Sequence, residues 1–508
     1  MLIFLGGCAG LMALAPLVLA VLIAFFYVEE DWRGAHAWAQ AKADIEAKGE
    51  TLDPEKFIPA PVPDAENFGA LPYFKVVTGP GGLTGRGWQR FSICDTLKNV
   101  TDKMAMSSDT SSAEDTLPYL GNWQKGEPPD SYRFTERMGA FLKRQQPQAI
   151  VPGNATPFEI FEMICPALVD LRSAAQSHTE CVFQEEINYG DPEKQTFGAN
   201  TSLISLIKIF MYDGRLAMLA NHPEIAIQDL RVGWRSASGV QKEPYSVANL
   251  VASGLIAIQL RLIQQGLSSH AWNEEQLGEL EGDMEKLDYL AQSRRQLNGE
   301  AACYSVPMID YYAAHRSRWA KDIDLLRSMF EDQDAWQARA FKATYLFIPN
   351  GWFDLAKADE IGRKIEKLRR IDLPSRQVHP GPEPEKSSDP AIWWLDFVLP
   401  DLNLTKDLVA HVAYTQVQLD EACIACRLER YWLAHHSYPM TLDDLANGYG
   451  PLPHDLMNGE AYHYRLNPDQ TYILYSVGWN QVDDHGDAGN VRTWESPDWI
   501  WTNYPTLK

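Results

Sequence analysis

The sequence predicts a mainly α protein with an N-terminal transmembrane helix, an irregular helical array and a small α+β module with a short antiparallel sheet. Three observations support this fold class. Residues 2–28 carry no charged side chain, residues 157–340 show helical periodicity, and residues 421–487 change from a helical to an alternating pattern. The expected divisions are an anchor (1–28), a helical stalk (29–50), a Pro-rich strap with loops (51–150), a helical domain (151–372), a Pro-rich loop and apolar connector (373–404) and the α+β module (405–508).

The N-terminal apolar run is long enough to cross a membrane. At about 1.5 Å per residue, residues 2–28 more than span a hydrocarbon core of about 30 Å. No Lys or Arg precedes the run, whereas a cleaved signal peptide normally begins with basic residues. We therefore favour an uncleaved single-pass anchor over cleavage or over lipidation at Cys8. The short N-terminus is expected in the cytoplasm, which places the bulk of the chain outside it, in an envelope space.

Composition limits the partners. The chain has 508 residues with 45% hydrophobic and 22% charged residues, which is ordinary for a protein with a sizeable core. A net charge of -23 repels phosphates, so we expect no nucleic-acid partner. Seven cysteines are too sparse for a disulfide scaffold, and their pairing cannot be read from the sequence.

Between the anchor and the helical domain, the pattern changes twice. Trp38, Ala41, Ile45 and Lys48 recur at helical spacing, which predicts a stalk that ends at Gly49. Five prolines in residues 52–74 then favour an extended strap or linker. The stretch from Gly79 to Asp130 is rich in Ser, Thr, Asp and Gly, and we expect loops and little order there.

The helical domain reads as a packed scaffold. Breaks are expected at His222-Pro223, Pro244 and Gly266. The piece RLAMLANHPEIAIQDLRVGW resembles a TPR-like hairpin, although no fixed repeat period recurs. The apolar runs 203–220 and 247–260 are expected to be buried helices, because the first carries charges and the second is too short to span a membrane.

Two polar stretches follow this domain. The basic run 363–370 is expected to be a solvated helix face. The Pro- and Ser-rich segment 378–390 is expected to be an exposed loop.

A long helix from about Lys406 to His435 opens the C-terminal module. Its apolar stripe contains both cysteines of a CxxC pair, Cys423 and Cys426, together with Val412, Leu419 and Leu433. CxxC followed by His435 and His436 offers zinc ligands, but a continuous helix lacks the turn with which CxxC clasps a metal. We expect core cysteines, and histidines that cap the helix end.

An acidic loop lies near the C-terminus. Asp483, Asp484 and Asp487 lie among glycines, and calcium prefers several oxygen ligands of this kind. The spacing is not that of an EF-hand. The two readings are a calcium site and a solvated acidic turn.

The order of parts in the module carries a resemblance. EACIACRLERYWLAHHSYPMTLDDL, PLPHDLMNGEAYHYRL and TYILYSVGWNQVDDHGD follow one another as long helix, short helix and alternating strands. This order resembles the C-terminal half of the major pseudopilin of type II secretion, which implies calcium in the acidic loop. With the anchor, the strap and the GWFD segment at 351–354, the chain is similar to a family of uncharacterised membrane-anchored bacterial proteins. This resemblance implies the bacterial inner membrane, with the bulk of the chain on the periplasmic side. It lacks a prepilin cleavage motif, so assembly into a pilus is not implied.

The sequence contains no P-loop, GxSxG, HExxH or dinucleotide motif, so no catalytic residue is assigned. We expect a membrane-anchored envelope protein with an assembly, scaffold or interaction role and an unidentified protein partner. The alternatives are an envelope hydrolase whose site comes from distant residues, and a calcium-stabilised surface binding module.

Overall fold

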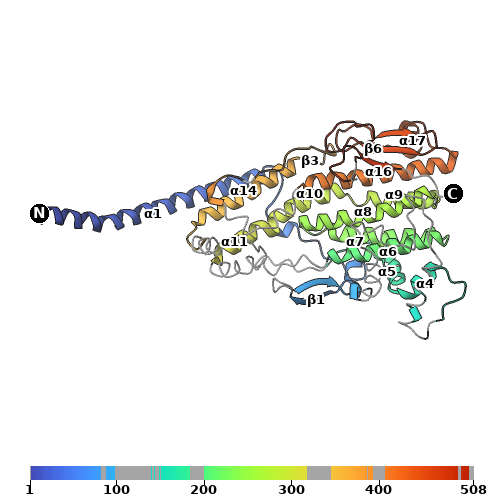
Figure 1. Cartoon of the computed structure of the whole chain (residues 1–508), viewed down its shortest axis with the longest axis horizontal. Coiled ribbons are helices and arrows are strands. Elements are labelled where there is room, and N and C mark those ends of the chain that lie inside the picture. Colours follow the sequence, from blue (N-terminus) through green and yellow to red (C-terminus); the bar gives the residue numbers. More distant parts are fainter. Residues whose placement is uncertain are drawn as a thin grey trace.

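The computed structural model describes residues 2–81, 87–95, 97, 139, 142–143, 148, 150–183, 200–316, 345–385, 387–392, 407–489 and 493–502. Within these ranges the protein is mainly helical and has three small antiparallel sheets, as the fold class predicted. Figure 1 shows a long first helix that extends away from a body of packed helices, with the C-terminal elements along one side of that body. The apolar connector beyond residue 392 lies outside the described residues.

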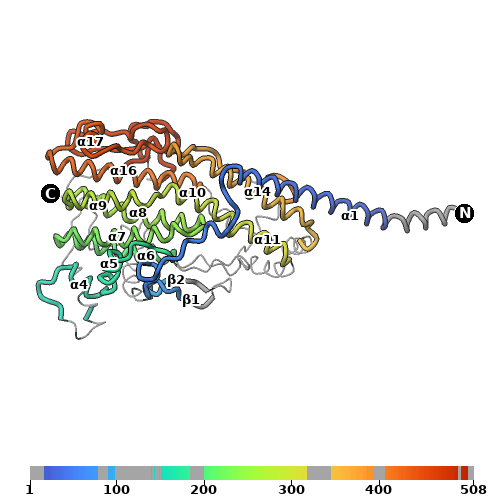
Figure 2. Tube along the Cα trace, turned by 180° about the vertical axis from the view of Figure 1, so that it is seen from behind, coloured from blue at the N-terminus to red at the C-terminus, as the bar shows by residue number. Residues whose placement is uncertain are grey.

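Helix α1 (Leu2–Glu46) joins the predicted anchor and the predicted stalk in one continuous helix. Its second half lies along α14 (Asn350–Arg369), while the preceding part extends away from the body (Figure 2). Ala41 and Ile45 of the predicted stripe are buried in a cluster with residues of α14. The stalk is therefore packed against the body and does not stand free. The chain turns at Gly49, whose φ of 77° suits glycine.

The strap crosses the surface of the body through three short 3₁₀ helices, so the expectation of extended backbone throughout was wrong. They are η1 (Pro54–Lys56), η2 (Phe68–Ala70) and η3 (Pro72–Phe74). The first two begin because Asp53 and Asn67 accept hydrogen bonds from backbone N–H groups two residues on, at 3.1 and 3.0 Å. The Asn67 amide also donates to the Val182 carbonyl at 3.0 Å, which ties the strap to the body.

A β-hairpin follows the strap where loops were expected. Strands β1 (Val76–Gly81) and β2 (Gly87–Phe91) pair antiparallel, with Val76 opposite Phe91. The pairing has an irregularity between Thr78 and Gly81. Nearly all of the remaining loop-rich region, to residue 138, lies outside the described residues.

The body consists of helices whose ends follow local signals. They are α4 (Pro157–Ile164), α5 (Ala167–Ser177), α6 (Thr201–Leu219), α7 (Pro223–Gln241), α8 (Ser246–Ser268), α9 (Glu274–Glu285), α10 (Tyr289–Glu300), the π-helical turn η6 (Ala301–Ser305) and α11 (Val306–Ala314). Pro223 opens α7, because the first helical position does not need an N–H donor. Pro244 separates α7 from α8 as predicted. The break predicted at Gly266 falls slightly later, because α8 continues to Ser268 and Gly266 leaves room for the Trp272 ring.

Helix α8 is longer than the sequence analysis expected. It is long and apolar enough to cross a membrane by length and composition, and is the one such helix among the residues whose side chains the structure describes; in α1 these begin at residue 16, so the apolar start of α1 is not among them. Most residues in the most apolar stretch of α8 are buried inside the body. Leu255, Ile256 and Ile263 lie in the main core. This burial agrees with the expectation of a core helix.

The C-terminal module has the predicted order of elements. Helix α16 (Leu408–His435) and helix α17 (Leu442–Tyr449) precede an antiparallel sheet of order β5-β6-β7, with β5 (His463–Leu466), β6 (Tyr472–Ser476) and β7 (Trp499–Thr502). Helix α16 contacts α8, α9 and α10 as well as the sheet. Because it is covered on more than one side, almost every residue from Leu408 to Glu429 is buried, and the single apolar stripe predicted for it was too narrow.

Candidate functional site

A cleft of about 670 Å³ lies where the C-terminal module meets the helical body. Its volume falls in the range of small-molecule sites, roughly 300 to 1,000 Å³, and such sites often lie between structural units. Its walls come from α9, α10, α16, the hairpin of β3 (Ile371–Asp372) and β4 (Gln377–Val378), and the segment after α17. The polar side chains among the lining residues are Glu285, Asp288, Tyr289, Arg376, Gln416, Asp420, Arg427 and His454.

Asp420 connects several walls of this cleft. Its carboxylate accepts hydrogen bonds from Arg376 Nη2 at 2.6 Å, from Gln416 Nε2 at 2.9 Å and from the Tyr462 hydroxyl at 3.1 Å. The residue is 5% exposed, so these donors replace water around a buried charge. Asp420 is not among the residues that the sequence pattern singled out, although its place beside Leu419 on an apolar helix face could have indicated it.

Cys423 lines the same cleft and Cys426 lies one helical turn further on. Both thiols are buried in the main core, as predicted. Burial raises the pKa of the Cys423 thiol well above its ordinary value, and it raises the pKa of the Cys426 thiol in the same direction. A thiol that stays protonated is a poor nucleophile and a poor metal ligand.

Arginines on α16 hold the module against α9. Arg427 pairs with Glu281 and donates through Nη1 to the Pro451 carbonyl at 2.7 Å. Arg430 reaches Glu274 at 2.7 Å and Glu281 at 3.1 Å. The contacts of Arg430 join two elements that are some 150 residues apart in sequence, and Arg427 also lines the cleft.

The end of α16 is also fastened to the body. Glu429, which is buried, accepts from the Tyr438 hydroxyl at 3.0 Å and lies 2.6 Å from His270 Nδ1. The His270 ring stacks on Trp432 with centroids 3.7 Å apart. His435 Nδ1 lies 2.9 Å from the Tyr431 carbonyl, and the His436 N–H donates to the Trp432 carbonyl at 2.7 Å. The His435 ring therefore reaches a carbonyl at this helix end, as predicted, whereas His436 contributes its backbone N–H.

A second hollow, of about 360 Å³, lies between α7, α9 and α10. Four cationic side chains line it, namely Arg231, Arg235, Lys242 and Lys286. Each already donates to an oxygen nearby: a carboxylate for three of them, and the Thr179 carbonyl for Arg235. The cationic character of this hollow is thus largely balanced by its own surroundings.

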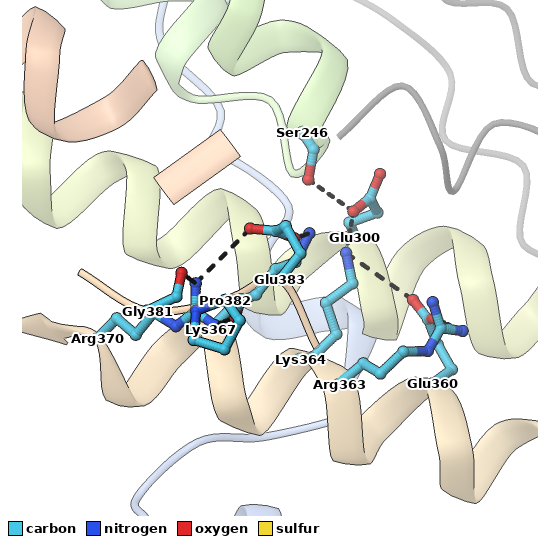
Figure 3. Close-up of polar contacts among 10 residues, drawn as sticks. All are labelled: Ser246, Glu300, Glu360, Arg363, Lys364, Lys367, Arg370, Gly381, Pro382 and Glu383. Atoms are coloured by element: carbon cyan, nitrogen blue, oxygen red, sulfur yellow. Dashed lines mark hydrogen bonds and ion pairs between the residues drawn. The ribbon is translucent and has the colours of Figure 1, made fainter. Parts of the chain in front are cut away.

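The basic run on α14 is only in part the solvated face that the sequence predicted, because Arg369 is 63% exposed whereas the other cations of the run are partly or fully buried. Lys364 is 4% exposed and pairs with Glu300 at the end of α10, and Glu300 also accepts from the Ser246 hydroxyl at 2.6 Å (Figure 3). Glu360 lies 3.8 Å from Lys364 Nζ and 2.9 Å from Arg363 Nη2. The sequence shows the positive charges, but Glu300, the carboxylate that pairs with the buried Lys364, comes from another helix, while Glu360 comes from α14 itself.

The Pro-rich segment folds back onto the same face of α14. Glu383 lies 2.9 Å from Lys367 and 3.6 Å from Arg370 (Figure 3). Arg370 Nη1 also donates to the Gly381 carbonyl at 3.1 Å. The segment is largely exposed, as predicted, but ion pairs hold it in place. We call the cluster of Ser246, Glu300, Glu360, Lys364, Lys367, Arg370 and Glu383 the α14 clasp.

The acidic loop near the C-terminus is organised by a carboxylate that the sequence analysis did not single out. Asp498, which is fully buried, accepts from the backbone N–H of Gly486 at 2.7 Å and of Asp484 at 3.3 Å. Burial raises the pKa of Asp498, and these two hydrogen bonds oppose the rise. In the sequence, Asp498 could have been noticed because it directly precedes the aromatic residues of β7.

The three predicted calcium ligands share this loop but have different partners. Asp483 accepts from the Tyr475 hydroxyl at 3.0 Å, Asp484 from the Asn480 amide at 2.9 Å, and Asp487 from the Gly489 N–H at 2.8 Å. The hydrogen bond from the His485 N–H lowers the pKa of Asp483, and the hydrogen bond from the Tyr475 hydroxyl lowers it further. Across the described part of the chain, no group of three or more His, Cys, Asp or Glu side chains is arranged to hold a metal ion. The calcium site stays one of the two interpretations of this loop, and the solvated acidic turn is the other.

A buried ionic cluster lies inside the helical body. Arg172 on α5 pairs with Asp213 on α6, with Asp229 on α7 at 2.6 Å and with Glu162 on α4. Arg172 is 4% exposed and both aspartates are fully buried. Burial raises the pKa of Asp229 to about 7, the Glu162 carboxylate adds to the rise, and Arg172 opposes it. The cluster connects four helices of the body.

Comparison with known proteins adds no relative to this picture: no family model, curated protein or solved structure matches the chain. The fold and the cleft define a mainly α protein with an extended N-terminal helix and a small α+β module. Within the described residues, most titratable side chains that line the cleft form hydrogen bonds or ion pairs with one another or with neighbouring groups.

Proposed function

We propose that this protein is a single-pass, membrane-anchored protein of the bacterial envelope with an assembly, scaffold or interaction role. In this proposal α1 crosses the inner membrane and the body lies on the periplasmic side. The observation that supports this proposal is the exposure of apolar side chains on the part of α1 that extends away from the body. Large apolar side chains from Leu17 to Val28 are 42 to 67% exposed, including Leu17, Val21, Phe25 and Val28.

Such a surface is unfavourable in water. Burying apolar surface contributes about 25 cal/mol per Å², so a long helix with exposed apolar side chains gains by entering a bilayer. A helix also satisfies its own backbone hydrogen bonds in lipid. A single isolated helix of this length suits an anchor better than a soluble extension.

The body supports a binding or scaffold role more than catalysis. A cysteine hydrolase needs an activated thiolate, but burial keeps the Cys423 thiol protonated. The Asp420 carboxylate in the same cleft is held by three donors. The envelope hydrolase therefore remains the less favoured alternative. The α6 and α7 pair, which we interpret as a TPR-like hairpin, and the pseudopilin-like module fit a protein that contacts partners.

Membrane fractionation tests the anchor. The full chain should stay with membranes after alkaline carbonate extraction, and a variant that lacks residues 2–28 should become soluble. Release of the full chain by carbonate would contradict the proposal. Protease added to spheroplasts should digest the body from outside, and protection of the C-terminus would contradict the periplasmic orientation.

The cleft can be tested separately with a photo-crosslinking amino acid. Leu373 lines the cleft and is 37% exposed, whereas Met440, which is 76% exposed, does not line it. We expect the Leu373 position to crosslink to one defined partner in native membranes and the Met440 position to give no such product. Equal products from both positions would contradict a partner site in the cleft.

A further inference from the structure

Two exposed apolar side chains lie beside the place where α1 leaves the body. Leu346 and Phe347 precede α14 and are 44% and 71% exposed. The Tyr27 hydroxyl of α1 donates to the Phe347 carbonyl. On the same side, the rings of Phe26 and Trp352 meet edge to face with centroids 6.4 Å apart. The turn of residues 345–348 is therefore held against the last part of the apolar run.

The position of charged groups along α1 places this turn near a membrane boundary. The apolar run of residues 2–28 is roughly 40 Å long at 1.5 Å per residue, about 10 Å more than a hydrocarbon core needs. The next turn of α1 carries Glu30 and Arg33, and Arg33 lies 2.5 Å from Asp389 of the body. Tyr27 thus lies within one turn of groups that require water. Its neighbour Phe347 lies at the same level.

Aromatic side chains gather at this level. Trp32 is 68% exposed and stacks on His36 at 5.5 Å, and Trp352 donates through Nε1 to Glu30 at 2.7 Å. Trp and Tyr are enriched where hydrocarbon meets headgroups, because their rings are apolar and their N–H or O–H groups stay hydrated. The exposed apolar surface of α1 reaches this level at Phe25 and Val28, and it adjoins Phe347 through Tyr27.

We infer that residues 345–348 form a second membrane contact, with Leu346 and Phe347 inserted at the boundary between lipid headgroups and acyl chains beside α1. The inference rests on the proposed membrane anchor. The occupant is lipid because the patch is continuous with the helix that crosses the bilayer. Two attachments, one of them on the body, orient the body relative to the membrane surface, where a lone anchor would leave it free to tilt.

The test uses the full chain in nanodiscs of phosphatidylethanolamine and phosphatidylglycerol. A nitroxide is attached at Phe347→Cys, and the matched control is Met440→Cys on the C-terminal module. Oxygen concentrates in lipid and a nickel chelate stays in water, so their collision rates with the nitroxide report depth. The parent protein treated with the same reagent supplies the background from native cysteines. Five of these, Cys165, Cys181, Cys303, Cys423 and Cys426, are buried.

We expect the nitroxide at position 347 to be several-fold more accessible to oxygen than to the chelate, and the one at position 440 to show the reverse. Accessibility to the chelate at both positions, in protein that co-purifies with nanodiscs, would overturn the second contact and leave the anchor intact. Failure of the full chain to enter nanodiscs would instead overturn the proposed anchor and, with it, this inference.

Discussion

Gly34 and Gly351 meet backbone to backbone where α1 passes α14. A Cβ atom on Gly34 would lie 2.0 Å from the Gly351 carbonyl oxygen, and one on Gly351 would lie 1.9 Å from the Glu30 carbonyl oxygen. The Gly351 N–H also donates to Asp31 Oδ1 at 2.8 Å, so α1 supplies a hydrogen-bond acceptor at the start of α14. This contact joins the proposed anchor rigidly to the body.

Replacing Gly351 with Ala should separate the two helices, because the added methyl group has no space. We expect a loss of stability of about 1 to 3 kcal/mol, as for overpacked sites. The matched control is Gly362→Ala on the same helix, where a Cβ meets nothing within 4 Å. There the better helix propensity of Ala should stabilise the protein slightly. Thermal unfolding of the full chain in nanodiscs compares the two, and equal melting temperatures would contradict the close helix contact.

The buried pair of Lys364 and Glu300 should be costly to break. Lys364→Met removes the cation and leaves Glu300 and Glu360 buried without it, which typically costs about 3 to 5 kcal/mol. The control is Arg369→Met, because the Arg369 side chain is 63% exposed and its pair with Glu366 contributes little, at most about 1 kcal/mol. Chemical denaturation measures both variants. A Lys364→Met protein as stable as the control would mean that the α14 clasp is solvated.

The ionic cluster in the body should make stability depend on pH. The pKa of Asp229 is raised from 3.8 to about 7, so the folded protein holds a proton that the unfolded chain releases. This contribution is present below about pH 4 and is lost as the pH rises through about 7, with a slope of at most about 1.4 kcal/mol per pH unit. We expect Asp229→Asn to remove this part of the slope between about pH 4 and 7, as measured by denaturant unfolding at a series of pH values. Asp44→Asn, at an exposed site on α1, should keep the wild-type slope.

The two cysteines of α16 should react with alkylating reagents only after unfolding. Burial raises the pKa of both thiols, so little thiolate is present at pH 8. Cys94, which is partly exposed, should be labelled before them. Replacing Cys423 and Cys426 together with Ala should lower stability by about 1 to 3 kcal/mol through lost packing. Stoichiometric zinc that disappears in the double variant would contradict this interpretation.

The acidic loop should depend more on Asp498 than on calcium. Asp498→Ala leaves the N–H groups of Asp484 and Gly486 without their acceptor, at a cost of about 1 to 3 kcal/mol. Because Asp498 already fixes the loop, we expect the same melting temperature for the wild type in calcium and in chelator.

A calcium site would give a different result in the same measurement. Calcium at a hundredfold excess over Kd stabilises a folded protein by about 2.7 kcal/mol. A rise in melting temperature with calcium that Asp484→Asn abolishes would support the site at Asp483, Asp484 and Asp487. It would also favour the calcium-stabilised binding module over the scaffold.

Local features of the sequence determined much of the secondary structure. Pro223 opens α7, and α16 ends at His435 just before Tyr438 and Pro439. These boundaries are readable because proline lacks an N–H and restricts the residue before it, whatever the rest of the chain does. The burial of Cys423 and Cys426 was also predictable, since both lie on the apolar side of a long helix. Pattern and local chemistry are sufficient for such features.

Only the tertiary structure decided which distant groups meet. The sequence shows Lys364 in a basic run, but a solvated run and one that faces buried carboxylates have the same local pattern. Glu300 is 64 positions away. Gly34 and Gly351, the walls of the cleft and the role of Asp498 depend likewise on contacts between segments far apart in the chain. The physical reason is that periodicity reports which face of an element is apolar, whereas a partner is selected by how the packed elements lie against each other.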